Sequence, residues 1–214
     1  SEYMNDVNSG TATQLALTPA LGQWLLDNAA TKYRPLGHNS LDRILQTFGT
    51  DKMQVCNGYL RLNKLCDGDV KNFAWCATDV KLMIAQNTVI TGLTPSGRFM
   101  TTKNNEPKAI NIIYAAVAPM GGDYAYFSKQ PTAHTIELNN TLRAVQFYGA
   151  AKYAYTQALK HGVWQRLVLT LLGADILGNA SQDVMHSVRW AMGMFTAWRP
   201  DALQRVHIEV LVHP

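Results

Sequence analysis

Apolar and polar positions follow a regular order through the second half of the chain. Apolar stretches of strand length occur at residues 110–118, 164–172 and 206–212. Between them, apolar residues recur every three or four positions over 134–160 and 183–195, which predicts two amphipathic helices. The order strand, helix, strand, helix, strand with short links is typical of a parallel or mostly parallel sheet with right-handed crossovers.

Two local sequence signals specify where the first helix ends and how the first strand is buried. Lys160, His161 and Gly162 give the first helix a cationic last turn and a left-handed stop. The stretch 110–118 is apolar except for Asn111, as expected for a strand that is covered on both faces.

The first half is less regular. Apolar residues at helical spacing predict helices over 15–29 and 41–48. An Asn-Gly pair between short apolar segments predicts a hairpin or turn over 53–62. We expect a strand at 80–90, and a loop at 91–108, which is rich in Gly, Pro, Thr, Lys and Asn.

The composition indicates a folded core. Hydrophobic residues make up 47% of the 214 residues, and charged residues only 16%. The usual charged fraction is about 25%, so this low value argues against a disordered or coiled-coil protein. We expect a helical extension over 1–50 followed by an α/β core over 51–214. Because the chain begins with Ser-Glu and stops at Pro214, it is expected to be an excerpt from a longer protein.

The charge and the cysteine content indicate which kinds of partner and which cellular location to expect. The net charge is +4, and the basic residues are scattered, so the sequence does not indicate reading of nucleic-acid sequence. Cys56, Cys66 and Cys76 form no Cys-x-x-Cys pair, which predicts no metal site. An odd number of cysteines without a secretory leader favours a reducing, cytoplasmic location. No apolar run approaches the roughly 18 residues that span a bilayer, so no membrane span is expected.

The residues after the middle strand have the form of a phosphate-binding turn. The apolar strand leads directly into Gly173, and Gly178 and Asn179 follow just before the next helix. Small residues let backbone N–H groups close on a diphosphate, and a helix N-terminus adds positive potential. In such a sheet, loops 86–97 and 119–126 reach the same carboxyl edge, so a nucleotide-type ligand is expected there.

Three segments of the second half form a pattern. They are Ile-Ile-Tyr-Ala-Ala-Val-Ala-Pro at 112–119, the helix end His161-Gly162, and the loop Gly173-x-x-x-x-Gly178-Asn179. Together they resemble the macrodomain family, in particular its poly(ADP-ribose) glycohydrolase-like branch. The resemblance is clearest over 110–212, about half of the chain.

The resemblance implies an α/β fold with a three-layer, mixed sheet flanked by helices. It implies a site for ADP-ribose or an ADP-ribosylated protein, without a cofactor or metal, and leaves open whether ADP-ribose is hydrolysed from modified proteins. The residues expected to bind the ligand lie in the loop and at two upstream positions near the distal ribose: Gly173, Ala174, Ile176, Leu177, Gly178, Asn179, Asn87 and Gly92. Catalysis would need Asp175, Glu106 or Asp123 as an acid or base.

Several acidic residues have two interpretations. Asp175 could act as a base, contact a cationic substrate group or coordinate a metal. It could instead hydrogen-bond the turn backbone or cap the following helix. Asp67-Gly68-Asp69 is typical of a turn, although an early acidic residue in macrodomains often meets the adenine amino group. Asp183 is most simply a partner of the helix dipole.

The alternative function is a non-catalytic ADP-ribose reader or a degenerate protein-interaction domain. The family's Gly-Gly-Gly run and paired acids are missing after Asn87, which favours this alternative. A third hypothesis is another α/β nucleotide-binding protein. However, neither a Gly-x-x-x-x-Gly-Lys-Ser/Thr nor a Gly-x-Gly-x-x-Gly fingerprint occurs.

Overall fold

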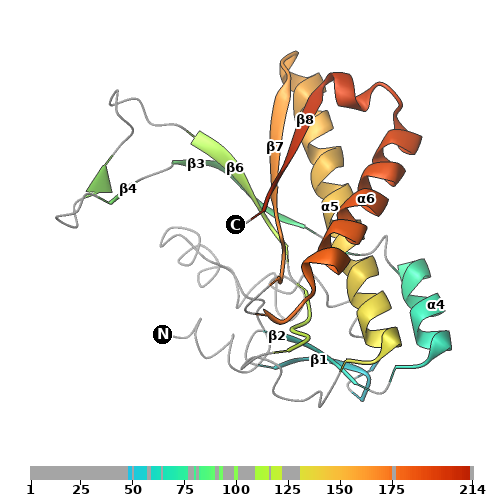
Figure 1. The fold of residues 1–214 in the computed structure, drawn as a ribbon. Coiled ribbons are helices and arrows are strands. Elements are labelled where there is room, and N and C mark those ends of the chain that lie inside the picture. The colour runs from blue at the N-terminus through green and yellow to red at the C-terminus, as the bar shows by residue number, and fades with distance from the viewer. Residues whose placement is uncertain are drawn as a thin grey trace, which may run out of the picture.

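The computed structural model describes a mixed α/β arrangement with three α-helices and eight strands among the described residues (Figure 1). The described residues are 48–49, 51–56, 59–63, 65–76, 80, 82–89, 92–93, 99–100, 109–115, 117–121, 131–174 and 177–212.

The second half follows the predicted order of elements. It consists of β6 (Ala109–Tyr114), α5 (Ala133–His161), β7 (Gln165–Thr170), α6 (Ser181–Trp198) and β8 (Val206–Leu211), with a short 3₁₀ helix η5 (Ala202–Gln204) before β8. Strands β7 and β8 are parallel and in register along their whole length. The prediction of a strand, helix, strand, helix, strand core is therefore confirmed.

The residues at both ends of α5 explain where the helix begins and ends. Thr132 is the N-cap, and its hydroxyl accepts a hydrogen bond from the backbone N–H of Thr135 at 3.2 Å. Gly162 is the C-cap with φ 65°, directly after the basic residues Lys160 and His161. The predicted cationic last turn and left-handed stop are confirmed.

The larger core lies between these two helices and the β7–β8 pair. Leu167 and Leu169 of β7 are buried against α5 and α6, and Tyr155 meets Phe195 edge to face at 6.3 Å between ring centroids. Both helices pack on the same face of β7–β8. The described residues therefore form two layers.

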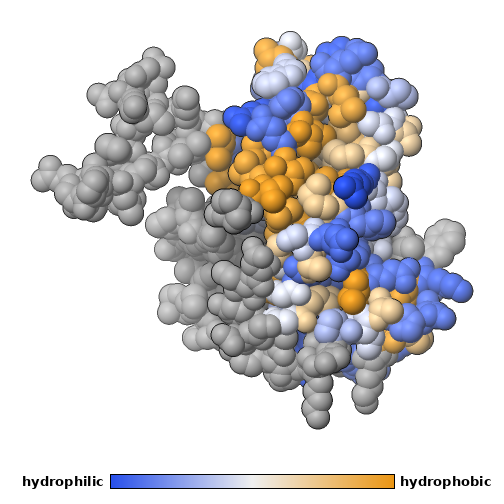
Figure 2. Space-filling model, viewed as in Figure 1, coloured by the Kyte–Doolittle hydropathy of each residue, from blue (hydrophilic) through white to orange (hydrophobic). Residues whose placement is uncertain are grey.

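The opposite face of the strands is exposed, and the prediction that the strand at 110–118 is covered on both faces is therefore wrong. Val168 of β7 is 42% exposed and Ile110 of β6 is 43% exposed. Figure 2 shows hydrophobic side chains gathered over the β7–β8 pair. The apolar stretches exceed what the helices cover, because α5 and α6 occupy one face only.

The strands do not join into one parallel sheet within the described residues. β6 pairs antiparallel with β3 (Met83–Val89), while β7 pairs only with β8. A cavity of about 470 Å³, lined by β6, β7 and α5, separates the two ladders. In Figure 1 the β3–β6 pair splays away from β7 at the start of β6 and approaches it where both strands end.

The first half forms a smaller cluster beside the N-terminal half of α5. The hairpin prediction for 53–62 is confirmed by β1 (Met53–Cys56) and β2 (Tyr59–Leu62), which pair antiparallel. Helix α4 (Asp67–Cys76) follows and contacts α5 (Figure 1). The apolar side chains of this second cluster come from the hairpin, α4, α5, the segment 117–121 after β6, and two residues outside these elements: Phe48, Met53, Leu60, Leu62, Leu65, Phe73, Ala118, Met120, Leu138 and Leu142.

Two local predictions were wrong. Asp67-Gly68-Asp69 is the first turn of α4 rather than a turn, because acidic residues are favourable at a helix N-terminus. Within the predicted loop 91–108, β4 (Gly92–Leu93) and β5 (Phe99–Met100) form a short antiparallel pair. The strand predicted over 80–90 is confirmed by β3.

None of the helices that the structure describes is both long and apolar enough to cross a membrane.

Candidate functional site

Two loops meet where β6 and β7 end. We call residues 117–121 the β6 loop and residues 173–179 the β7 loop, whose Asp175 and Ile176 lie outside the described residues. The backbone carbonyl of Leu177 accepts hydrogen bonds from the N–H groups of Met120 at 2.7 Å and Gly121 at 3.2 Å. The carboxyl ends of the two strands are therefore joined by their loops, although the strands themselves do not pair.

Gly178 allows this close approach. Its φ is +67°, and a Cβ at this position would lie 2.5 Å from the backbone nitrogen of Gly121. Both the left-handed backbone and the contact therefore require glycine.

Gly173 plays a similar part at the other end of the β7 loop. Its φ is +80°, and a Cβ there would collide with the side chain of Val117. The carbonyl of Gly173 accepts a hydrogen bond from the backbone N–H of Asn179 at 3.2 Å, and Ala174 forms a bridge with Asn179. The β7 loop is thus closed on itself and packed against the β6 loop.

The Asn179 side chain ties both loops to α5. Its Oδ1 accepts hydrogen bonds from Nδ2 of Asn139 and from Nη2 of Arg143, each at 2.7 Å. Its Nδ2 donates to the carbonyl of Gly173 at 2.8 Å and to that of Ala118 at 3.3 Å. All three side chains are buried, and we refer to Asn139, Arg143 and Asn179 as the polar clamp.

Asn139 holds the β6 loop from the other side. Its Oδ1 accepts from the N–H of Ala118 at 2.9 Å, and its Nδ2 donates to the carbonyl of the same residue at 3.1 Å. One asparagine therefore hydrogen-bonds both backbone groups of a buried loop residue, and Asn179 supplies a second donor to its carbonyl.

Arg143 is the charged member of the polar clamp and is 0% exposed. It donates from Nε to the carbonyl of Leu172 at 3.1 Å and from Nη1 to Asn140 at 2.8 Å and Ser187 at 3.3 Å. Burial lowers the pKa of Arg143 to about 10, and the nearby charge of Asp183 opposes that shift. The guanidinium therefore remains protonated at neutral pH, directly behind the β7 loop.

The N-terminus of α6 follows the β7 loop and has no side-chain cap. The N-cap residue is Ala180, which cannot accept a hydrogen bond through its side chain. Its carbonyl accepts from the N–H groups of Asp183 and Val184. No described residue accepts from the N–H groups of Ser181 and Gln182, and both residues are exposed. These amides are therefore open to an anion from solvent.

The β7 loop brings together five of the predicted ligand-binding residues: Gly173, Ala174, Leu177, Gly178 and Asn179. Two of their N–H groups are already used inside the protein, since Ala174 donates to Leu171 and Asn179 to Gly173. The amides of Gly178 and of the first turn of α6 are better placed to meet a ligand.

The upstream candidates lie elsewhere. Asn87 is an exposed residue of β3 with φ 54°, and its N–H donates to Oδ1 of Asn111 on β6 at 3.0 Å. Gly92 lies in β4. No described contact joins either residue to the β7 loop, so their place near a distal ribose stays a prediction. Of the other candidates, Ile176, Asp175, Glu106 and Asp123 lie outside the described residues.

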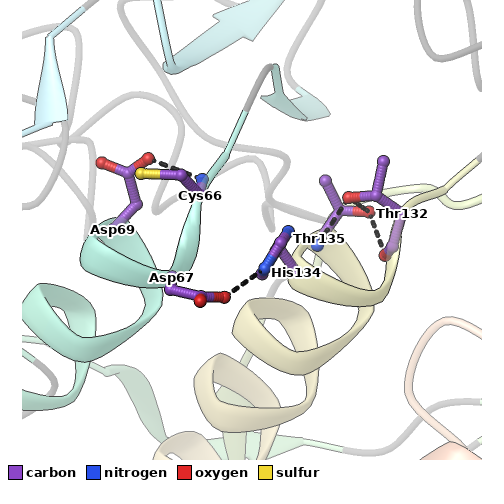
Figure 3. Close-up of polar contacts among 6 residues, drawn as sticks. All are labelled: Cys66, Asp67, Asp69, Thr132, His134 and Thr135. Atoms are coloured by element: carbon purple, nitrogen blue, oxygen red, sulfur yellow. Dashed lines mark hydrogen bonds and ion pairs between the residues drawn. The ribbon is translucent and has the colours of Figure 1, made fainter.

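Asp67 and Asp69 serve the packing of α4 (Figure 3). Asp69 is buried, and its carboxylate accepts hydrogen bonds from the N–H of Cys66 at 2.9 Å and from Nζ of Lys52. The hydrogen bond from Lys52 is the main reason that the pKa of Asp69 is lowered. Asp67 pairs with His134 of α5. These contacts explain both carboxylates without a ligand.

Sequence reasoning missed the polar clamp residues of α5. Asn139 and Arg143 are four residues apart, and each directly follows a buried leucine, Leu138 or Leu142. Polar residues at this spacing beside a helix's apolar stripe are expected to face the interior, where they need partners. That signal could have predicted a buried polar network before the structure was known.

Comparisons with known proteins identify no relative: no family model, no curated protein and no solved structure matches the chain.

Proposed function

We propose that the chain binds ADP-ribose, free or attached to a protein, and that the ligand's diphosphate lies on the β7 loop and the first turn of α6. The proposal rests mainly on one observation: the uncapped N-terminus of α6 follows a glycine loop that is locked against the β6 loop. The choice of ADP-ribose as the ligand rests, in addition, on the resemblance of this loop to the corresponding loop of macrodomains.

The electrostatics of this region favour an anion. An α-helix carries the equivalent of about half a positive charge at its N-terminus, and unpaired N–H groups point out of its first turn. The amides of Ser181 and Gln182 have no described acceptor. The buried charge of Arg143 adds to this potential, and the nearby carboxylate of Asp183 offsets part of it.

The rigidity of the two loops also favours binding. The polar clamp fixes the backbone of Ala118, Leu172 and Gly173 through five hydrogen bonds to their N–H and carbonyl groups. A loop that is ordered before the ligand arrives loses less conformational entropy on binding. The same arrangement in a flexible loop would bind the diphosphate more weakly.

A reader and a hydrolase differ in whether an acid or base acts on the ribose, and the candidates Asp175, Glu106 and Asp123 lie outside the described residues. Among the described carboxylates, Asp183 is the nearest in sequence to the β7 loop; it lies in the first turn of α6 and acts on Arg143 through its charge. Its position is that of a helix-dipole partner rather than of an acid placed on a ribose. Incubation with ADP-ribosylated protein separates the two functions: a reader retains the modified protein, while a hydrolase releases free ADP-ribose.

A charge placed at the helix start tests the proposal. Ser181→Glu adds a carboxylate beside the open amides, whereas Ser181→Gln adds a similar volume without charge. In calorimetric titration with ADP-ribose, we expect Ser181→Glu to weaken binding about tenfold and Ser181→Gln to change it less than about twofold.

The same charge has the opposite effect on the fold, because an acidic residue in the first turn stabilises a helix by about 0.5 kcal/mol. Ser181→Glu should therefore unfold at an equal or higher urea concentration than the parent chain. Equal ADP-ribose binding by the parent and both variants, or no binding by the parent, would contradict the proposal.

A further inference from the structure

A second cavity lies on the other packing surface of α5, away from the two loops. It has a volume of about 500 Å³ and is bounded by α5, α6 and the segment that leads into β3. The side chains that line it are mainly apolar and include Leu82, Ile84, Val145, Trp190 and Met194. Volumes of this size, apolar lining and a few polar groups are typical of small-molecule sites.

Gly149 shapes the wall of this cavity. It lies on α5 between the lining residues Tyr148 and Lys152, and a Cβ there would come within 2.8 Å of Cδ1 of Leu82. The glycine therefore leaves room between α5 and the segment that precedes β3. A larger residue would require the Leu82 side chain to shift.

Among the described residues that line this cavity, Lys152 alone is charged. Its Nζ lies 5.2 Å from the ring centroid of Tyr148 and 5.0 Å from that of Trp198, so two aromatic faces hold the ammonium in place. Arg199 lies 5.6 Å from the same Trp198 ring. No described Asp or Glu forms an ion pair with Lys152 or Arg199. The rim thus carries positive charge without a described counter-ion.

We propose that this cavity binds a medium-chain fatty acid, with the hydrocarbon tail among the apolar side chains and the carboxylate on Lys152. An apolar lining excludes a diphosphate nucleotide, and a lone ammonium at the rim favours one anionic head group over a neutral one. The site is separate from the proposed ADP-ribose site, because none of the described residues of the β7 loop lines it.

Octanoate and octan-1-ol, which differ in the head group only, serve as probes. In calorimetric titration of the full 214-residue chain, we expect octanoate to bind about five- to tenfold more tightly than octanol. Lys152→Gln should lower octanoate binding to the level of octanol. The matched control is Lys160→Gln, an exposed position in the last turn of the same helix, which should change neither.

Location is tested separately by the methyl resonances of the eight methionines. Octanoate should shift the Met194 methyl, assigned with Met194→Leu, and leave the buried Met53 unchanged. Lys152→Gln should keep the parent's melting temperature and its ADP-ribose affinity. Equal binding of both probes, no effect of Lys152→Gln, a shift at Met53 without one at Met194, or no saturable binding would overturn the proposal.

Discussion

The two halves of α5 bury different kinds of surface. The C-terminal half presents alanines and Tyr155 to β7, β8 and α6, and forms an ordinary apolar core. The N-terminal half packs Leu138 and Leu142 into the smaller apolar cluster and also places Asn139 and Arg143 beneath the two loops, where they form directed hydrogen bonds. Apolar packing is non-directional and mainly stabilises the fold, whereas a buried polar network also fixes one geometry. We therefore expect mutations in the two halves to separate stability from binding.

The largest effect on stability is expected in the apolar half. Phe195 is fully buried, and Phe195→Ala leaves a cavity between α5 and α6. The free energy of unfolding should fall by about 3–5 kcal/mol, measured by urea denaturation. The protein that remains folded should bind ADP-ribose within about twofold of the parent. A tenfold loss of affinity would show that the two halves are not separable.

In the polar clamp, Arg143→Met should lower both the stability of the fold and the affinity for ADP-ribose. Methionine fills most of the volume but leaves the Leu172 carbonyl and Oδ1 of Asn179 short of a donor. We expect a loss of about 3 kcal/mol in unfolding free energy. ADP-ribose affinity should drop at least tenfold at a temperature where the variant is folded. Parent-like affinity in a destabilised variant would mean that the clamp does not shape the site.

A smaller effect is expected where the loops touch. Gly178→Ala adds a Cβ at positive φ against the backbone of Gly121, and should cost about 2 kcal/mol. Gly193→Ala is the matched control, because it lies within α6 with nothing within 4 Å of the added Cβ. That variant should be more stable by about 0.5–1 kcal/mol. If both variants melt alike, the contact between the loops is not as tight as the geometry indicates.

The smallest effect on stability is expected for the hydrogen bond between Lys52 and Asp69, which lies outside the two loops. The pKa of Asp69 is lowered by its hydrogen bond from Lys52. A lowered folded-state pKa stabilises the fold above the unfolded-state value, and this stabilisation disappears as the pH falls through the folded-state value. Asp69→Asn should therefore cost about 1 kcal/mol at pH 7 and progressively less below about pH 4. Urea midpoints across this range, with unchanged ADP-ribose affinity, test the expectation; a pH-independent difference would contradict it.

Sequence periodicity predicted the local elements well and their assembly poorly. The C-terminal end of α5, the apolar stripes of α5 and α6, and the pairing of β1 with β2 are determined by neighbouring residues and were predicted correctly. The stripe of α5 also predicts Leu159 on the buried face, yet Leu159 is 52% exposed and Ala158 takes that place. Over so long a helix, the real period of 3.6 residues shifts the buried face away from a simple count of three and four.

The glycines of the candidate site could be predicted from the sequence, but the helix residues that hold the loops were not. The glycines of the β7 loop are visible in the sequence, because their backbone conformation excludes other residues. Asn139 and Arg143 give a weaker signal, which is their place beside the apolar stripe of α5, and their partner Asn179 is far from them in the sequence. The pairing of β6 with β3, and not with β7, depends on contacts between distant segments that local patterns do not encode.

The central claim is that the open amides after the β7 loop bind a diphosphate. Backbone ¹⁵N–¹H spectra recorded during titration with ADP-ribose test it residue by residue. The largest shifts should occur at Gly178, Ser181 and Gln182, with none at the hairpin residues Leu60 and Leu62. Saturable binding that leaves these three amides unmoved, or no saturable binding, would contradict the claim.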